Sequence, residues 1–148
     1  MRVIMSIKEI DEFEPIKELI HKSRVLVRKI LDNHFDKIPH DKARREIEMR
    51  FFFNKVKFIT KKWTLEIIWE LEIHEGLHFN EIMRHLTGKR KKISTRSLSD
   101  ILKKLQKFGL VSRSIQDTRP PTVFYQLTDK GKGFVELSIP LIMHLIEL

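Results

Sequence analysis

The pattern of apolar and polar positions is most regular between Ile93 and Leu110. Apolar residues recur there at helical spacing and predict one buried stripe, made of Leu98, Ile101, Leu102 and Leu105. Ser94 is a suitable N-cap residue, and Gly109 can take the positive φ that ends a helix. The opposite face is basic and polar, with Thr95, Arg96, Ser99, Lys103 and Lys104. We predict an amphipathic helix over residues 94–108 that can contact phosphates and base edges in a DNA major groove. A solvated helix face is the plainer interpretation of the same pattern.

Two helices and a basic turn are predicted before this segment. Residues 61–74 predict a helix that ends at Gly76, with a buried face made of Trp63, Ile67, Ile68 and Leu71. Residues 79–86 predict a shorter helix that Asn80 would cap, with Ile82, Met83 and Leu86 facing inward. The turn over residues 87–92 contains four consecutive basic residues, Lys89, Arg90, Lys91 and Lys92. A helix, a turn and a second helix with a basic outer face are typical of a DNA-reading helix-turn-helix.

After Gly109 the period of the pattern changes from about 3.6 to 2, which indicates strands. Two strands are predicted, one over residues 111–115 and one over residues 122–127, joined by a loop that contains Pro120 and Pro121. A hairpin directly after a recognition helix is typical of a wing. We expect Arg113 and Arg119 to reach the DNA backbone or the minor groove from this wing, over residues 111–127. The alternative is a hairpin that only stabilises the fold.

The two ends of the chain predict helices with apolar faces. A short helix is expected from Ser6 to about Phe13, a second from Pro15 to before Pro39, and a third after a cap at Asp41. Near the C-terminus, Thr128 is expected to cap a helix that either kinks at Pro140 or restarts at Ser138. The last apolar residues are expected to bury against the N-terminal arm, in the same subunit or in a second one: Leu141, Ile142, Leu145 and Ile146.

Composition narrows the possible classes of function. The 148 residues carry a net charge of +9, which favours a polyanionic partner such as nucleic acid or an anionic membrane surface. The chain has no cysteine, which excludes disulfides and thiolate chemistry. No signal peptide is evident, and no apolar run approaches the roughly 20 residues of a membrane span. We therefore expect a cytoplasmic protein that does not enter a membrane.

Four segments resemble the HxlR-type winged-helix transcriptional regulators: KWTLEIIWEL (62–71), HFNEIM (78–83), ILKKLQKFGLV (101–111) with Ile93 and Ser94 before it, and PPTVFYQLTDKGKGF (120–134). The resemblance covers roughly residues 61–137. It implies a homodimer that binds operator DNA with a recognition helix in the major groove and a wing beside it. Carried over by position, the DNA-facing residues are Thr95, Arg96, Ser99 and Lys103.

The chain departs from the pattern of this family at several points. Thr122 stands where the family often has a basic residue after the second wing proline, so the wing contact must shift to Arg119 or weaken. The cysteine that members usually carry before the first domain helix is missing, so their redox sensing does not transfer. The turn over residues 87–92 is longer than in the family, and the N-terminal arm lies outside the resemblance.

Neither catalysis nor a metal site is expected. The chain contains no Gly-rich phosphate loop, no G-x-S-x-G and no H-E-x-x-H. His74 and His78 are four residues apart, but Gly76 between them breaks the helix that would align them; His85 and Glu75 are nearby in the sequence. Scattered histidines are the favoured interpretation, and no cofactor is predicted.

The sequence thus predicts a mainly α fold with a small β-hairpin wing, a winged helix-turn-helix. An N-terminal arm (residues 1–60), a DNA-binding domain (61–137) and a C-terminal helix (138–148) are expected, the first and last of which would form a homodimer. The predicted function is sequence-specific regulation of transcription on double-stranded DNA, with no enzyme activity; the sequence does not identify an effector. Alternatives are a non-specific or architectural nucleic-acid-binding protein and, less favoured, a protein-interaction winged helix. The residues expected to contact DNA are Asn80, Lys89, Arg90, Lys91, Lys92, Ser94, Thr95, Arg96, Ser99, Lys103, Lys104, Arg113 and Arg119.

Overall fold

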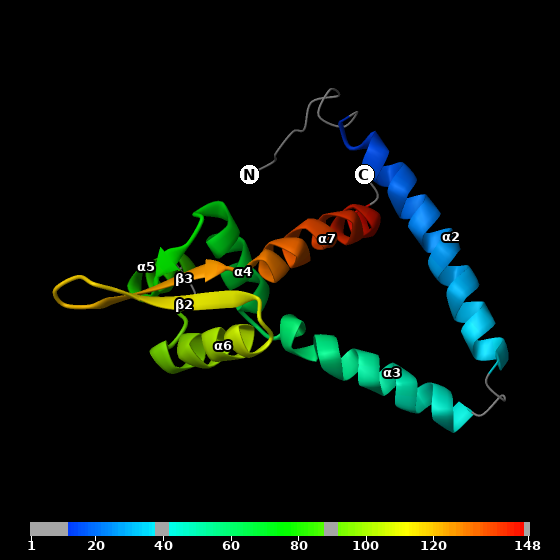
Figure 1. Ribbon diagram of the computed structural model, residues 1–148, viewed down its shortest axis with the longest axis horizontal. Helices are drawn as coiled ribbons and strands as arrows, with labels where there is room; N and C mark the ends of the chain where they lie inside the picture. Colours follow the sequence, from blue (N-terminus) through cyan, green and yellow to red (C-terminus); the bar gives the residue numbers. More distant parts are fainter. Residues whose placement is uncertain (1–11, 38–41, 88–91, 147–148) are drawn as a thin grey trace. The chain divides into compact units, whose positions relative to one another are not determined.

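The computed structural model describes residues 12–37, 42–87 and 92–146 (Figure 1). Three sequence predictions fall outside these residues: most of the helix expected from Ser6, the cap at Asp41, and the basic side chains of Lys89, Arg90 and Lys91. The elements follow in the order α2 (Glu14–Lys37), α3 (Lys42–Val56), the 3-10 helix η1 (Lys57–Thr60), α4 (Thr64–Ile73), β1 (Leu77–His78), α5 (Phe79–Leu86), α6 (Thr95–Lys107), β2 (Val111–Gln116), β3 (Thr122–Leu127) and α7 (Asp129–Ile146).

The chain divides into two compact units. One consists of Met1–Phe51 with Leu137–Leu148, and the other is Phe52–Glu136. The second unit, which we call the core unit, holds α4, β1, α5, α6, β2, β3 and the start of α7. Helix α7 belongs to both units, since it runs without interruption through Pro140. The alternative of a second helix restarting at Ser138 is therefore wrong.

The hydrophobic core of the core unit is built from the apolar stripes of three helices. Its most deeply buried side chains are Ile67, Ile68 and Leu71 of α4, Ile82 of α5, and Leu98, Leu102 and Leu105 of α6. Tyr125 and Leu127 of β3 and Val135 of α7 close the same cluster. The helical periodicity of the sequence therefore identified most of the inward-facing positions of the three helices. Met83 and Ile101 are only half-buried against the core.

A three-stranded antiparallel sheet of order β1-β3-β2 lies beside these helices (Figure 1). The predicted hairpin is present, with Val111 opposite Leu127 and Gln116 opposite Thr122. Strand β1 was not predicted, and it pairs Leu77 with Tyr125. The backbone enters β1 through Gly76 at a φ of +116°, where an added Cβ would lie 2.3 Å from the Phe124 ring. Only a glycine fits there without a shift of the ring.

Two predicted helix starts need correction. The helix expected over residues 61–74 begins at Thr64, because η1 and a turn occupy the preceding residues and Trp63 has a φ of +75°. Trp63 is therefore half-buried at the core edge instead of lying on the buried helix face. Helix α5 is capped at His78 and not at Asn80: the His78 backbone N–H donates to Glu81 Oε1 at 2.9 Å. Asn80 is exposed in the first turn.

Within the other unit, much apolar surface is exposed in the single chain. Helix α3 buries no residue. Leu19 on α2, Ile47 on α3 and Leu145 on α7 are 60%, 68% and 71% exposed. Burial of the last apolar residues within one subunit is therefore not observed, although Met143 is buried.

Every helix in the described part of the chain is too short or too polar to cross a bilayer.

Candidate nucleic-acid interface

Helix α6 is held by its apolar stripe and by both of its ends. Ser94 caps it as predicted, since its Oγ accepts a hydrogen bond of 3.0 Å from the Ser97 backbone N–H. Gly109, at a φ of +75°, ends it. Leu98, Leu102 and Leu105 fix the inner face, each at most 1% exposed. The outer face is therefore presented by a helix that has little freedom to rotate about its axis.

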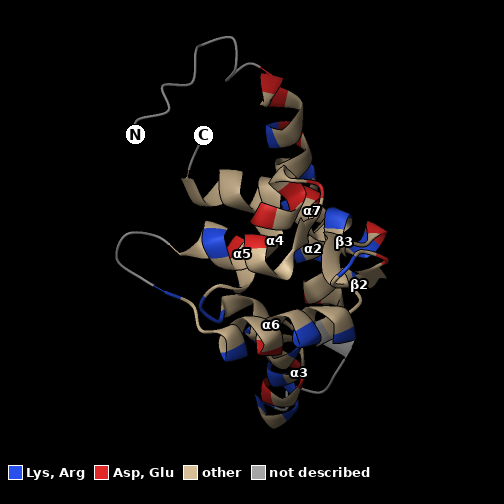
Figure 2. Ribbon diagram, turned by 90° about the vertical axis from the view of Figure 1, so that its left-hand side faces the viewer, with Lys and Arg blue, Asp and Glu red and all other residues tan. Residues whose placement is uncertain are grey.

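The outer face of α6 carries three residues that were predicted to read DNA. Arg96, Ser99 and Lys103 follow one another at spacings of three and four, so they share one side of the helix. Arg96 and Lys103 are exposed, and Ser99 is half-buried. Thr95 is exposed in the first turn. In Figure 2, Lys and Arg positions are distributed along α6, with an acidic one among them. This side of α6 can therefore contact a polyanion through two cationic side chains, Arg96 and Lys103, and through the Ser99 hydroxyl.

Lys104 lies on a different side of α6 from the one predicted. It lines a pocket of about 540 Å³ together with Lys61, Lys62, Lys92, Ser94, Ser97 and Asp100. The pocket is also lined by Thr64, whose side chain is buried, and by the apolar side chains of Phe58, Trp63, Ile93 and Ile101. The structure therefore gives Lys104 neighbours from other segments, Lys61 and Lys62, that the sequence analysis did not place beside it.

The ammonium groups of Lys61 and Lys104 lie close together in this pocket. Lys104 lowers the pKa of Lys61 through a side-chain hydrogen bond and through charge repulsion. Asp100 is the acidic side chain among the lining residues, against four lysines. An anion in the pocket would relieve the repulsion between the two amines. The adjacent KK pair at residues 61–62 was visible in the sequence, but only the fold brings it to α6.

The β2–β3 hairpin is part of the core unit and matches the predicted wing. Arg113 on β2 and Arg119 in the connecting loop are both exposed. The loop is closed by Thr118, whose hydroxyl donates to the Pro120 carbonyl at 2.8 Å and lies 3.0 Å from the Thr122 hydroxyl. Thr122 therefore has a structural role at the position where the related family often places a basic residue.

One histidine ties the base of the wing to α5. His78 Nε2 lies 2.6 Å from Gln116 Oε1 at the end of β2, and its Nδ1 contacts Glu81 of α5. Both contacts raise the pKa of His78, Gln116 more than Glu81. The His78 backbone and side chain in turn lower the pKa of Glu81. These hydrogen bonds connect the helix-turn-helix to the hairpin. Sequence spacing alone does not reveal them, because Gln116 is 38 residues away from His78 in the chain.

Comparisons with known proteins agree with this geometry. The family described as HxlR-like helix-turn-helix matches residues 58–147. The candidate regulatory protein MalR of Fusobacterium mortiferum is 35% identical over 83 residues, which are 55% of this chain and 74% of the relative. The uncharacterised HTH-type transcriptional regulator YvaP of Bacillus subtilis (strain 168) is 33% identical over 86 residues, 58% of this chain and 75% of the relative.

Among solved structures, a candidate transcriptional regulator of the MarR family from Enterococcus faecalis V583 superposes with a TM-score of 0.54 at 28% identity, over 74% of this chain and 90% of that one. These similarities confirm the winged helix-turn-helix fold and the expectation of a regulator rather than an enzyme. The chain belongs to the HxlR-like helix-turn-helix family of DNA-binding transcriptional regulators.

Proposed function

We propose that two copies of the chain bind a specific site on duplex DNA, each placing α6 in the major groove and its β2–β3 wing along the backbone or in the minor groove. The observation that carries the proposal is the common exposed side of Arg96, Ser99 and Lys103 on a helix whose opposite side is anchored in the core. A recognition surface needs this combination, because base readout requires side chains held in register with the groove.

The side chains divide into two groups by their surroundings. Arg96 is the candidate for a bidentate contact to guanine, since its guanidinium fork matches the two acceptors on that base edge. The lysines of the pocket next to α6 are candidates for phosphate contacts that add affinity without sequence preference: Lys61, Lys62, Lys92 and Lys104. Arg113 and Arg119 would make the corresponding contacts from the wing.

Pairing of two chains is supported by the apolar surface outside the core unit. Leu19, Ile47, Met49 and Leu145 are all at least 60% exposed. A soluble monomer rarely exposes apolar helix faces of this kind, whereas a C2 dimer buries them against their own copies. Cytoplasmic residence follows from a role on the chromosome.

Selection of bound sites from random duplex DNA tests the proposal directly. A two-fold motif with half-sites about 10 base pairs apart, or a multiple of that spacing, is the expected result for a dimer that reads sequence. Binding without any enriched motif would favour the non-specific alternative, in which lysines coat the backbone. A lack of duplex binding at low salt would overturn the proposal and favour a protein-interaction domain.

A further inference from the structure

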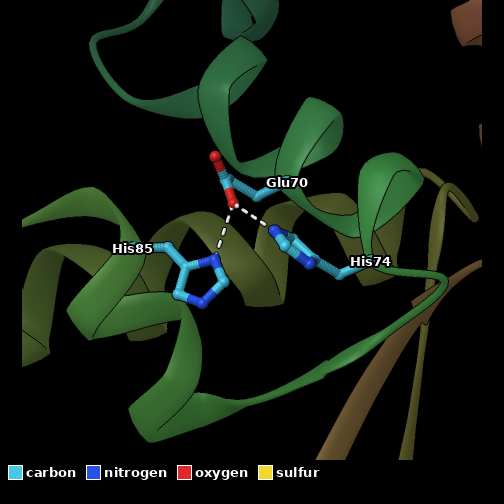
Figure 3. Close-up of side chains that lie close together, drawn as sticks. All are labelled: Glu70, His74 and His85. Carbon is cyan, nitrogen blue, oxygen red and sulfur yellow. Dashed lines mark hydrogen bonds and ion pairs between the residues drawn. The ribbon is translucent and has the colours of Figure 1, made fainter.

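Three side chains of α4 and α5 meet at one carboxylate oxygen, and none of them is among the residues proposed to contact DNA (Figure 3). Glu70 Oε2 lies 3.3 Å from His74 Nε2 and 2.8 Å from His85 Nδ1. The two imidazole rings face each other edge to face, with centroids 4.5 Å apart. Among the described residues, these three form a group whose His and Glu donor atoms all lie within 4.8 Å of one another.

The fold positions the three groups before any ligand binds. Glu70 and His74 are one helical turn apart on α4, so they project from the same side. His85 comes from the last turn of α5, and its neighbours Ile82 and Leu86 are buried in the same core as Ile67 and Leu71 of α4. Because the two helices pack against each other through these residues, His85 is held opposite the α4 pair.

The donor set has the chemistry and the spacing of a transition-metal site. Two imidazoles and one carboxylate are ligands that zinc accepts, whereas magnesium and calcium prefer oxygen alone. Donors that lie about 2.0–2.1 Å from Zn²⁺ at tetrahedral angles are about 3.3–3.4 Å from one another. The separation of Glu70 Oε2 from His74 Nε2 already has this value, and the donor atoms of all three residues lie within 4.8 Å of one another. Glu70 Oε2 and His85 Nδ1, now 2.8 Å apart, would have to separate slightly to bind one ion.

We propose that Glu70, His74 and His85 form a binding site for a divalent transition-metal ion, with Zn²⁺ as the best match. Each side chain is between 26% and 40% exposed, so an ion can enter and water can fill the remaining coordination position. The site bridges α4 and α5, the two helices that precede the recognition helix, so a bound ion stabilises the packing of the core unit. It does not depend on the proposed DNA contacts.

Sequence spacing suggested a different pair. His74 and His78 are four residues apart, but that pair was set aside because Gly76 lies between them, and His78 contacts Glu81 and Gln116 at the base of the wing. The informative spacing was Glu70 with His74, four residues apart on an unbroken helix, and the third ligand required the tertiary structure. The competing interpretation is an ion-pair cluster that needs no metal, in which protonated imidazoles pair with Glu70.

Calorimetric titration of the chelator-treated full chain with ZnCl2, without DNA, separates the two interpretations. One site per chain is expected in the wild type and is lost, or weakened at least about tenfold, in His74→Gln and in His85→Gln, because each removes one of three ligands. His21→Gln, which changes an exposed histidine of α2, is the matched control and should bind as the wild type does. MgCl2 is expected to give no binding at this site.

Thermal unfolding gives a second readout from the same samples. Zn²⁺ should raise the Tm of the wild type and of His21→Gln, because it binds the folded state, and should leave the Tm of His85→Gln unchanged. Equal zinc binding by the wild type and both ligand variants, or no binding by any of them, overturns the proposal. Circular dichroism of His74→Gln and His85→Gln confirms that both are folded. These measurements contain no DNA, so they stand or fall separately from the proposed function.

Discussion

The proposed readout by Arg96 makes a quantitative prediction for Arg96→Ala. Arg96 is exposed on α6, so its removal should change the free energy of unfolding by no more than about 0.5 kcal/mol. Loss of a bidentate guanine contact costs about 1–3 kcal/mol, which corresponds to a loss of about 5- to 150-fold in the ratio of operator to random-DNA affinity. The affinity for random DNA should fall much less, because Arg96 makes no specific guanine contact on most random sequences.

Two comparison variants make this test specific. Lys92→Ala, in the pocket next to α6, removes a proposed phosphate contact and should weaken operator and random DNA by similar factors. Lys132→Ala removes the same charge from an exposed position of α7, beside Glu72, Glu75 and Glu136, and should change neither affinity. Fluorescence anisotropy with both DNAs at one salt concentration measures the ratios. If Arg96→Ala weakened the affinity for operator and random DNA by equal factors, as is expected for Lys92→Ala, the distinction between a base contact by Arg96 and a phosphate contact by Lys92 would be refuted.

Further predictions concern salt, stability and pairing. Affinity for duplex DNA should fall with salt at a log–log slope of about −4 to −5 for about five phosphate contacts, and a slope near zero in a salt titration would contradict an electrostatic interface. Leu102→Ala, at a site 1% exposed, should lower the free energy of unfolding by about 2–5 kcal/mol in urea titrations, against a negligible change in Lys132→Ala. The contacts of His78 with Gln116 and Glu81 should stabilise the fold most strongly between pH 4.5 and 6.5. Because these contacts raise the pKa of His78, its contribution to stability is lost as pH rises above 6.5, and because His78 lowers the pKa of Glu81, the Glu81 contribution is lost as pH falls below 4.5. Unfolding of Glu81→Gln should lose the pH dependence below 4.5 and keep most of that above 6.5, because Gln116 contributes most to the raised pKa of His78. An unchanged profile below pH 4.5 would show that Glu81 contributes nothing. Leu145→Lys should shift a dimer to monomer in light scattering while the core unit stays folded, whereas a monomeric wild type would refute the pairing proposal.

The spacing of apolar residues along the sequence was sufficient to predict most elements of the core unit, but it did not reveal the shortest one, strand β1. Helices α5 and α6 and the β2–β3 hairpin were predicted within a few residues, since each has several repeats of its apolar pattern. Strand β1 has two residues, too few to show any period, and exists because Tyr125 and Phe124 provide a paired edge. The start of α4 was misplaced because basic residues before it are compatible with a helix, while the backbone at Trp63 is left-handed.

What the sequence determined by itself is the identity of the buried stripe of α6 and, as its complement, the exposed basic side, because both follow from helical geometry along a single segment. Tertiary structure alone decided which side chains from separate segments meet. Lys61 reaches Lys104, Gln116 reaches His78, and Glu70 and His74 reach His85 only because the shared core sets how α4, α5, α6 and β2 pack. Contacts between segments depend on that packing, and no local pattern of residues encodes it.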